Sequence, residues 1–219
     1  MKFTRDEIRS AMLLYAVTDR TWLKGRTLPE VTEEVLKHGA TFLQVREKGM
    51  DHAAFLAEAE RLKEQAGRYH VPFVVNDSIE VALECDADGV HVGQSDIVGK
   101  DVRALIGSDK ILGISANTVE TAVAAEKAGA DYIGVGAVFG TTTKQDAKSL
   151  TLDALRAICD AVTIPVVAIG GISADNLLQL QGSGVDGVAV VSAIFAQEDP
   201  GAATEHLRAL AEQLVASHG

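Results

Sequence analysis

Short apolar runs alternate with longer amphipathic segments along the chain, and this alternation restricts the possible folds more than any other feature of the sequence. The apolar runs cover residues 13–18, 41–46, 73–75, 89–92, 111–114, 132–135, 166–169 and 187–191. Amphipathic segments with a helical pattern lie between them, for example at 51–68, 118–128, 152–159 and 173–181, and a final helix is expected at 202–216. Short buried strands that alternate with helices are typical of a parallel sheet.

The number of strands separates the two common parallel architectures. Eight strand–helix units in 219 residues predict an α/β fold with one domain over 1–219, a single (β/α)8 TIM barrel. A doubly wound open sheet is the alternative. Its roughly five or six strands would leave two of the apolar runs without a place.

A short internal repeat fits the barrel. Segments 38–43, 85–90, 128–133 and 183–188 resemble one another and precede alternate strands. In each of them a helix ends at a small residue, the chain turns, and a strand begins. We therefore expect Thr41, Asp88, Asp131 and Asp186 at the amino-terminal end of the barrel, which serves stability and not catalysis.

The charge and the cysteines restrict the partners and the compartment. A formal net charge of −11 disfavours binding to nucleic acid and to anionic lipid, and 5% aromatic residues give little surface for base stacking. No segment has the ~18 uninterrupted apolar residues of a membrane span. Cys85 and Cys159 lack a nearby Cys or His at ligand spacing, so we expect reduced core thiols. We expect a cytoplasmic protein with small-molecule substrates, no nucleic acid and no membrane partner, and a homo-oligomer is compatible with the sequence.

The strand at 41–46 ends in a cationic segment. Side chains alternate along a strand, so Gln44, Arg46 and Lys48 share one face while Val45 and Glu47 share the other. Two cations facing the barrel interior are costly unless an anion or a partner meets them. The segment therefore indicates a clamp for phosphate or diphosphate, and the alternative is a salt bridge across the barrel.

Carboxylates follow the next two strands. Asp77 follows the strand at 73–75, after Asn76, and Asp96 follows the strand at 89–92. Mg²⁺ favours one or two carboxylates together with water and phosphate oxygens, so the two carboxylates predict a magnesium site beside the clamp. The alternative for either residue is that it caps the following helix.

Three further polar residues at strand ends allow two interpretations each. His91 is either a ligand or base, or a hydrogen-bonded residue of the inner layer, and Gln94 is open in the same way. Ser115 either binds substrate or only turns the chain. The sequence shows no Ser–His–Asp set and no lysine in mid-strand.

A second anion site is predicted after the last three strands. The long segment 136–149 offers the hydroxyls of Thr141, Thr142 and Thr143 and the ammonium group of Lys144. The glycines at 170–171 and the helix start after Val191 and Ser192 match the usual phosphate site of barrels. Two anion sites suggest two phosphorylated substrates, one of them a diphosphate.

The strand-end segments together closely resemble the thiamine phosphate synthase family. The matching pieces are 14–19, 44–48, 76–77, 89–96, 113–116, 141–144, 168–172 and 190–194. They run in the family's order over nearly the whole chain. The family commonly has proline between the threonines and near Phe139, where this chain has Thr142 and Gly140, so we expect a less stiff loop.

The resemblance implies a magnesium-dependent transferase of thiamine biosynthesis. Hydroxymethylpyrimidine diphosphate would lose pyrophosphate through a pyrimidine carbocation, and the nitrogen of thiazole phosphate would take its place, giving thiamine phosphate. The segment Gln44, Val45, Arg46, Glu47 and Lys48, with Asn76, Ser115 and Lys144, would bind the pyrimidine diphosphate. Within that set Arg46, Lys48, Ser115 and Lys144 would be catalytic. Asp77 and Asp96 would hold Mg²⁺, and Thr141, Thr142, Thr143, Gly171, Val191 and Ser192 would hold the thiazole phosphate.

Two alternative functions stay open. The first is a thiazole phosphate tautomerase or another phosphate-binding barrel isomerase, which would not need the cationic clamp together with two metal carboxylates. The second is a barrel that senses a ligand without catalysis.

Overall fold

The computed structural model describes residues 3–95, 99–139 and 150–216. Its eight strands are β1 Leu14–Val17, β2 Phe42–Val45, β3 Phe73–Asn76, β4 Gly89–Val92, β5 Ile111–Ser115, β6 Tyr132–Val135, β7 Val166–Ile169 and β8 Gly187–Val190. They pair in parallel in chain order, and β1 also pairs with β8. The predicted closed barrel is confirmed, and the open sheet is excluded.

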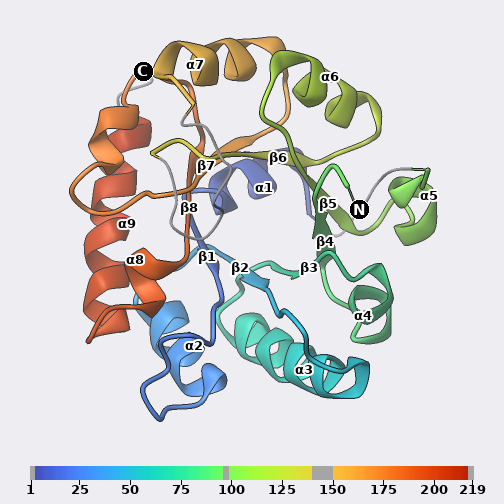
Figure 1. Cartoon of the computed structure of the whole chain (residues 1–219), viewed down its shortest axis with the longest axis vertical. Coiled ribbons are helices and arrows are strands. Elements are labelled where there is room, and N and C mark those ends of the chain that lie inside the picture. The colour runs from blue at the N-terminus through green and yellow to red at the C-terminus, as the bar shows by residue number, and fades with distance from the viewer. Residues whose placement is uncertain (1–2, 96–98, 140–149, 217–219) are drawn as a thin grey trace.

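The helices form a ring around the strands (Figure 1). They are α1 Arg5–Ala11, α2 Leu28–Lys37, α3 His52–Arg68, α4 Ile79–Glu84, α5 Val102–Ile106, α6 Val119–Lys127, α7 Leu152–Ala161, α8 Ser192–Phe195 and α9 Pro200–Ala216, with the 3₁₀ helix η1 at Leu177–Leu180. Most helices that follow a strand begin at a side-chain N-cap, as Asp51 does for α3 and Thr151 for α7. Such caps start each helix at a defined residue and so fix where the loop after the preceding strand ends.

The predicted helix at 173–181 is reduced to η1. Asn176 donates a hydrogen bond from Nδ2 to the Gly171 carbonyl (2.8 Å) and accepts one from the Ser173 N–H (2.8 Å). These side-chain bonds hold Asn176 at φ −126°, outside the helical region, so the helical pattern starts only after it.

Side-chain alternation divides the core into two layers. In β1, Leu14 and Ala16 pack outward against the helices, whereas Tyr15 and Val17 belong to a cluster inside the barrel. The inner cluster includes Ile8 and Met12 from α1 and the residue after it. Helix α1, which the sequence analysis did not predict, therefore closes one end of the barrel, and Figure 1 shows it across the centre of the ring.

The internal repeat forms four equivalent clamps at the amino-terminal end. Asp88 accepts the N–H of Phe73 at 2.9 Å. Asp131 accepts that of Leu112, Asp186 that of Val166, and Thr41 that of Leu14, each at 2.8 Å. Each clamp ties the start of one strand to the start of the strand before it. The structural interpretation of the repeat is confirmed.

Two smaller expectations can be compared with the described residues. Cys85 and Cys159 are both free thiols, the first buried and the second half-buried. Within the described ranges, no helix combines the length and the apolar character needed to cross a membrane.

Candidate active site

The cationic segment lies at the carboxyl end of β2. Gln44 is buried inside the barrel, where its Nε2 donates to the Tyr15 hydroxyl at 2.6 Å. Arg46 follows the strand, and its backbone N–H donates to Thr18 Oγ1 at 3.0 Å. Among the residues the structure describes, neither Arg46 nor Lys48 forms an ion pair, so the alternative of a salt bridge across the barrel finds no partner there.

Val45 and Glu47 point away from the interior. Val45 is fully buried in the outer core between strands and helices. Glu47 pairs with Arg20 at 2.6 Å, and Arg20 also pairs with Glu58 of α3 at 2.7 Å. Burial raises the pKa of the Glu47 carboxyl, and the Arg20 guanidinium opposes that shift. Val45 and Glu47, predicted as part of the binding segment, could therefore contact a ligand at the barrel mouth only through their backbone.

Asp77 directly follows β3 and has an unusual backbone conformation. Its φ is +61°, a left-handed value that non-glycine residues rarely adopt and that clusters at functional sites. Its N–H donates to the His91 carbonyl on β4 at 2.8 Å, and its Oδ2 accepts from Asn76 Nδ2 at 2.6 Å. The helix cap of α4 is Ser78, whose Oγ accepts the Val81 N–H. The capping alternative is therefore wrong for Asp77.

The donor set at this strand end suits a hard cation. A carboxylate with an adjacent side-chain amide supplies the oxygen ligands that Mg²⁺ prefers, and water and phosphate oxygens complete such sites. Asp96, the second predicted ligand, lies outside the described residues. Over the described ranges, no group of three or more His, Cys, Asp or Glu side chains is placed to hold a metal ion.

Ser115 ends β5 and does more than turn the chain. Its Oγ lies 3.0 Å from His91 Nε2, and its carbonyl accepts from Gln94 Nε2 at 2.6 Å. His91 Nδ1 lies 2.9 Å from the Tyr132 hydroxyl, which in turn lies 2.8 Å from the Tyr15 hydroxyl. His91 is therefore a hydrogen-bonded residue of the inner layer, and Gln94 supports the backbone at Ser115.

Tyr15 and Tyr132 were not singled out by the sequence analysis. A signal exists in the sequence, because both tyrosines occupy inward positions of their strands, and Gly113 in β5 leaves space for one of them. A Cβ atom on Gly113 would lie 2.2 Å from Tyr132 Cζ and 2.6 Å from His91 Nδ1. Only glycine fits at this position beside the two rings.

The second predicted anion site lies after β7 and β8. Gly170 and Gly171 both have positive φ, and a Cβ atom on Gly170 would lie 2.8 Å from Ala137 Cα. Val191 precedes α8, which begins at Ser192 with no side-chain cap among the described residues. Backbone N–H groups at such a helix start can bind an anion. Thr141, Thr142, Thr143 and Lys144 lie outside the described residues.

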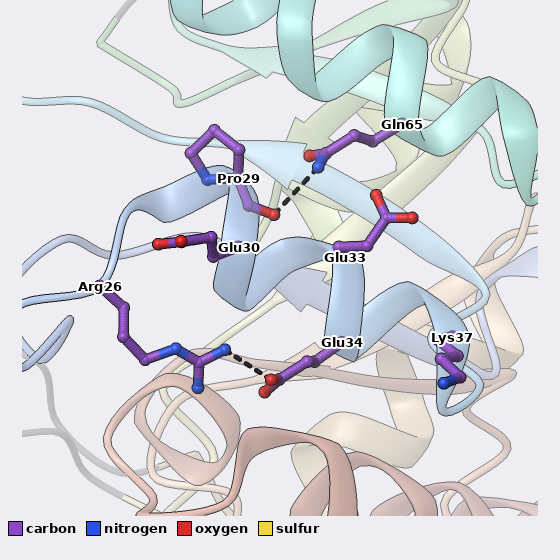
Figure 2. A pocket seen from close by; sticks show the side chains of 7 residues that line it. All are labelled: Arg26, Pro29, Glu30, Glu33, Glu34, Lys37 and Gln65. Atoms are coloured by element: carbon purple, nitrogen blue, oxygen red, sulfur yellow. Dashed lines mark hydrogen bonds and ion pairs between the residues drawn. The ribbon is translucent and has the colours of Figure 1, made fainter.

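A separate groove opens on the outer surface between α2 and α3 (Figure 2). Arg26 pairs with Glu34 at 2.6 Å, and Gln65 donates to the Pro29 carbonyl at 3.0 Å. Its lining residues belong to α2 and α3, apart from Arg26 just before α2. The groove is a solvated helix surface and is not connected to the predicted chemistry.

Comparison with known proteins decides the family. The sequence profile described as Thiamine monophosphate synthase matches residues 14–194. The chain belongs to the thiamine monophosphate synthase family. A thiamine-phosphate synthase of Clostridium tetani is 46% identical over 89% of this chain and 93% of its own length, and that of Ruminiclostridium cellulolyticum is 49% identical over 89% and 92%.

A solved structure of the family supports the same assignment. Thiamine phosphate pyrophosphorylase from Pyrococcus furiosus superimposes with a TM-score of 0.87 at 39% identity, covering 95% of this chain and 99% of that one. The resemblance found from the strand-end segments is confirmed. Membership of this family makes the chain a transferase of thiamine biosynthesis that acts on small molecules.

Proposed function

We propose that the barrel mouth catalyses the magnesium-dependent condensation of 4-amino-2-methyl-5-hydroxymethylpyrimidine diphosphate with thiazole phosphate. In this reaction the bond between the pyrimidine methylene carbon and the diphosphate oxygen breaks, and pyrophosphate leaves with the electron pair. The thiazole nitrogen then donates its lone pair to the methylene carbon, giving thiamine phosphate. No protein nucleophile is required.

The arrangement at β2 and β3 supports the first half of this reaction. Arg46 and Lys48 follow β2, and Asp77 follows β3, which is its direct neighbour in the barrel. The register pairs Val45 with Val75, so Arg46 lies beside Asn76, next to Asp77. Fixed positive groups at a leaving diphosphate stabilise the charge that grows in the transition state. This juxtaposition of two cations without described ion pairs and a carboxylate that does not cap a helix is the observation that carries the proposal.

The metal would be held by Asp77 and Asp96. When bound, Mg²⁺ would neutralise charge on the diphosphate oxygens and orient the leaving group. The chain's own part is to hold the ligands: the hydrogen bonds from Asn76 to the Asp77 carboxylate and from the Asp77 N–H to the His91 carbonyl fix the carboxylate at the strand end.

The thiazole phosphate would bind on the opposite side of the mouth. Gly171, Val191 and Ser192 would offer backbone N–H groups, and Thr141, Thr142, Thr143 and Lys144 would add hydroxyls and an ammonium group. Two separated sites would hold the nitrogen against the pyrimidine carbon and reduce the chance that water attacks first.

The direct test mixes both substrates with the protein and follows pyrophosphate release. Release should require both substrates and should stop when a chelator removes the metal. Activity that is undiminished by the chelator would favour the isomerase reading. Absence of pyrophosphate release with both substrates and Mg²⁺ present would leave a binding protein without catalysis.

A further inference from the structure

A chain of hydrogen bonds crosses the barrel interior below the mouth. It runs from Gln44 on β2 through Tyr15 on β1 and Tyr132 on β6 to His91 on β4, and ends at Ser115 on β5. Its distances lie between 2.6 and 3.0 Å. The two tyrosines are buried, with exposed fractions of 1% and 0%, whereas Ser115 is half-buried at the strand end.

The series of hydrogen bonds can have only one direction at a time, because each hydroxyl carries one hydrogen. Gln44 Nε2 donates to the Tyr15 oxygen, and at 2.8 Å either phenol could donate to the other. We choose the arrangement in which every hydroxyl hydrogen has an acceptor along the series, with the Tyr15 hydrogen directed to the Tyr132 oxygen. The Tyr132 hydrogen is then directed to His91 Nδ1. Burial raises the pKa of both phenols, so both keep their hydrogens at neutral pH.

The direction fixes the tautomer of His91. A neutral imidazole whose Nδ1 accepts a hydrogen bond carries its hydrogen on Nε2. In this tautomer the Nε2–H would donate to Ser115 Oγ, which lies 3.0 Å from Nε2. The Ser115 hydroxyl hydrogen is then directed elsewhere, and the carboxyl end of β5 opens toward the mouth.

We infer that Tyr132 is a positioning residue, which holds His91 in the Nε2–H tautomer so that Ser115 donates its hydroxyl hydrogen to the substrate. This role rests on the proposed function, since it assigns Ser115 to the pyrimidine diphosphate. Gly113 is needed for the same arrangement, because a side chain at this position would displace the Tyr132 ring and His91. Tyr132 itself touches no reacting atom.

The first test is the ¹⁵N NMR spectrum of the histidine-labelled full chain, with the His91 signals assigned through His91→Gln. In the wild type, Nδ1 should show the shift of a ring nitrogen without hydrogen and Nε2 that of one with hydrogen. Tyr132→Phe removes the donor, so it should give a mixture of tautomers. A wild-type Nδ1–H tautomer, or a spectrum unchanged by Tyr132→Phe, would overturn the inference. This readout does not depend on turnover, so it separates failure of the inference from failure of the proposed function.

The second test is a double-mutant cycle between Tyr132 and Ser115. Tyr132→Phe should lower kcat about 5- to 10-fold with KM changed less than about 2-fold, since one hydrogen bond is lost. In the Ser115→Ala background, Tyr132→Phe should have no further effect on kcat. A matched control is Tyr69→Phe, which removes a hydroxyl bonded to Glu33 at 2.7 Å outside the barrel and should leave kcat unchanged. Independent, multiplying effects of the Tyr132 and Ser115 changes would show that Tyr132 acts only on structure and would overturn the proposal.

Discussion

The two ends of the barrel use the same residue types in opposite ways. At the amino-terminal end, Asp88, Asp131 and Asp186 each accept a backbone N–H, and Asp131 and Asp186 also pair with arginines. At the carboxyl end, Asp77 has a left-handed backbone, and no ion pair to Arg46 or Lys48 is found within the described part of the chain. At the amino-terminal end the carboxylates bond to the backbone starts of the strands, whereas Arg46 and Lys48 at the carboxyl end have no ion pair among the described residues. The contacts of a charged residue therefore distinguish residues that stabilise the fold from residues predicted to bind substrate, and the residue type alone does not.

The largest effect is expected at Asp77. Asp77→Asn keeps the size of the side chain and tolerates the positive φ, but it removes the charge that would hold the metal. Turnover should fall about 10²- to 10³-fold, while the thermal unfolding midpoint changes little. Pyrophosphate release and a melting curve measure the two quantities.

The matched control is Asp51→Asn, the same chemical change at the N-cap of α3, where Asn caps equally well. It should leave turnover unchanged. Near-normal turnover of Asp77→Asn at low magnesium would remove Asp77 from the metal site.

The opposite outcome is expected at Asp131. Asp131→Ala leaves the Leu112 N–H without its acceptor and Arg103 without its carboxylate, 2.6 Å away in the wild type. The free energy of unfolding should fall by about 2–4 kcal/mol, with kcat of the folded enzyme unchanged. Urea titration and kinetics at low temperature would measure this.

Asp131→Asn should lose less stability, because its side-chain oxygen can still accept the Leu112 N–H. A fall in kcat without loss of stability in either variant would contradict the division between the two ends.

A smaller effect on kcat/KM is expected at Arg46, where two substitutions distinguish the role of the charge from that of the planar guanidinium group. Arg46→Lys keeps the positive charge but loses the planar fork, so kcat/KM for the pyrimidine diphosphate should fall about 10-fold, and Arg46→Ala should lower it further. Steady-state kinetics with varied diphosphate concentration would show this. Equal losses in both variants would mean that the fork, and not the charge, carries the interaction.

The smallest effect is expected on the reactivity of the Cys159 thiol, which lies beside Gly184 near the amino-terminal end of the barrel. Burial, followed by the charges of Asp186 and Asp160, raises the pKa of the Cys159 thiol to about 12. Its thiolate fraction should therefore be small at pH 8, and alkylation of the folded protein should keep accelerating up to about pH 10. Mass spectrometry of alkylated peptides can follow this. A rate that levels off near pH 8.5 would mean that this end is open to solvent.

The sequence predicted the strands well because buried parallel strands are continuous apolar runs. It placed Arg46 and Asp77 at the same rim because the carboxyl ends of barrel strands lie together, and the roles of both residues stay predictions. It missed α1, whose seven residues are too short for a clear period, and it overextended η1, where Asn176 bonds to the backbone. The hydrogen bond between Tyr15 and Tyr132 joins β1 and β6, which lie on different sides of the closed barrel. No local pattern in the sequence reports that contact.

The most direct test of the account is a crystal structure with Mg²⁺ and pyrophosphate bound. We expect the metal on the carboxylates of Asp77 and Asp96, and the pyrophosphate on Arg46 and Lys48, which follow β2. Pyrophosphate bound only at Gly171 and Ser192, with the metal absent from Asp77, would contradict the assignment of the leaving group to this side of the barrel mouth.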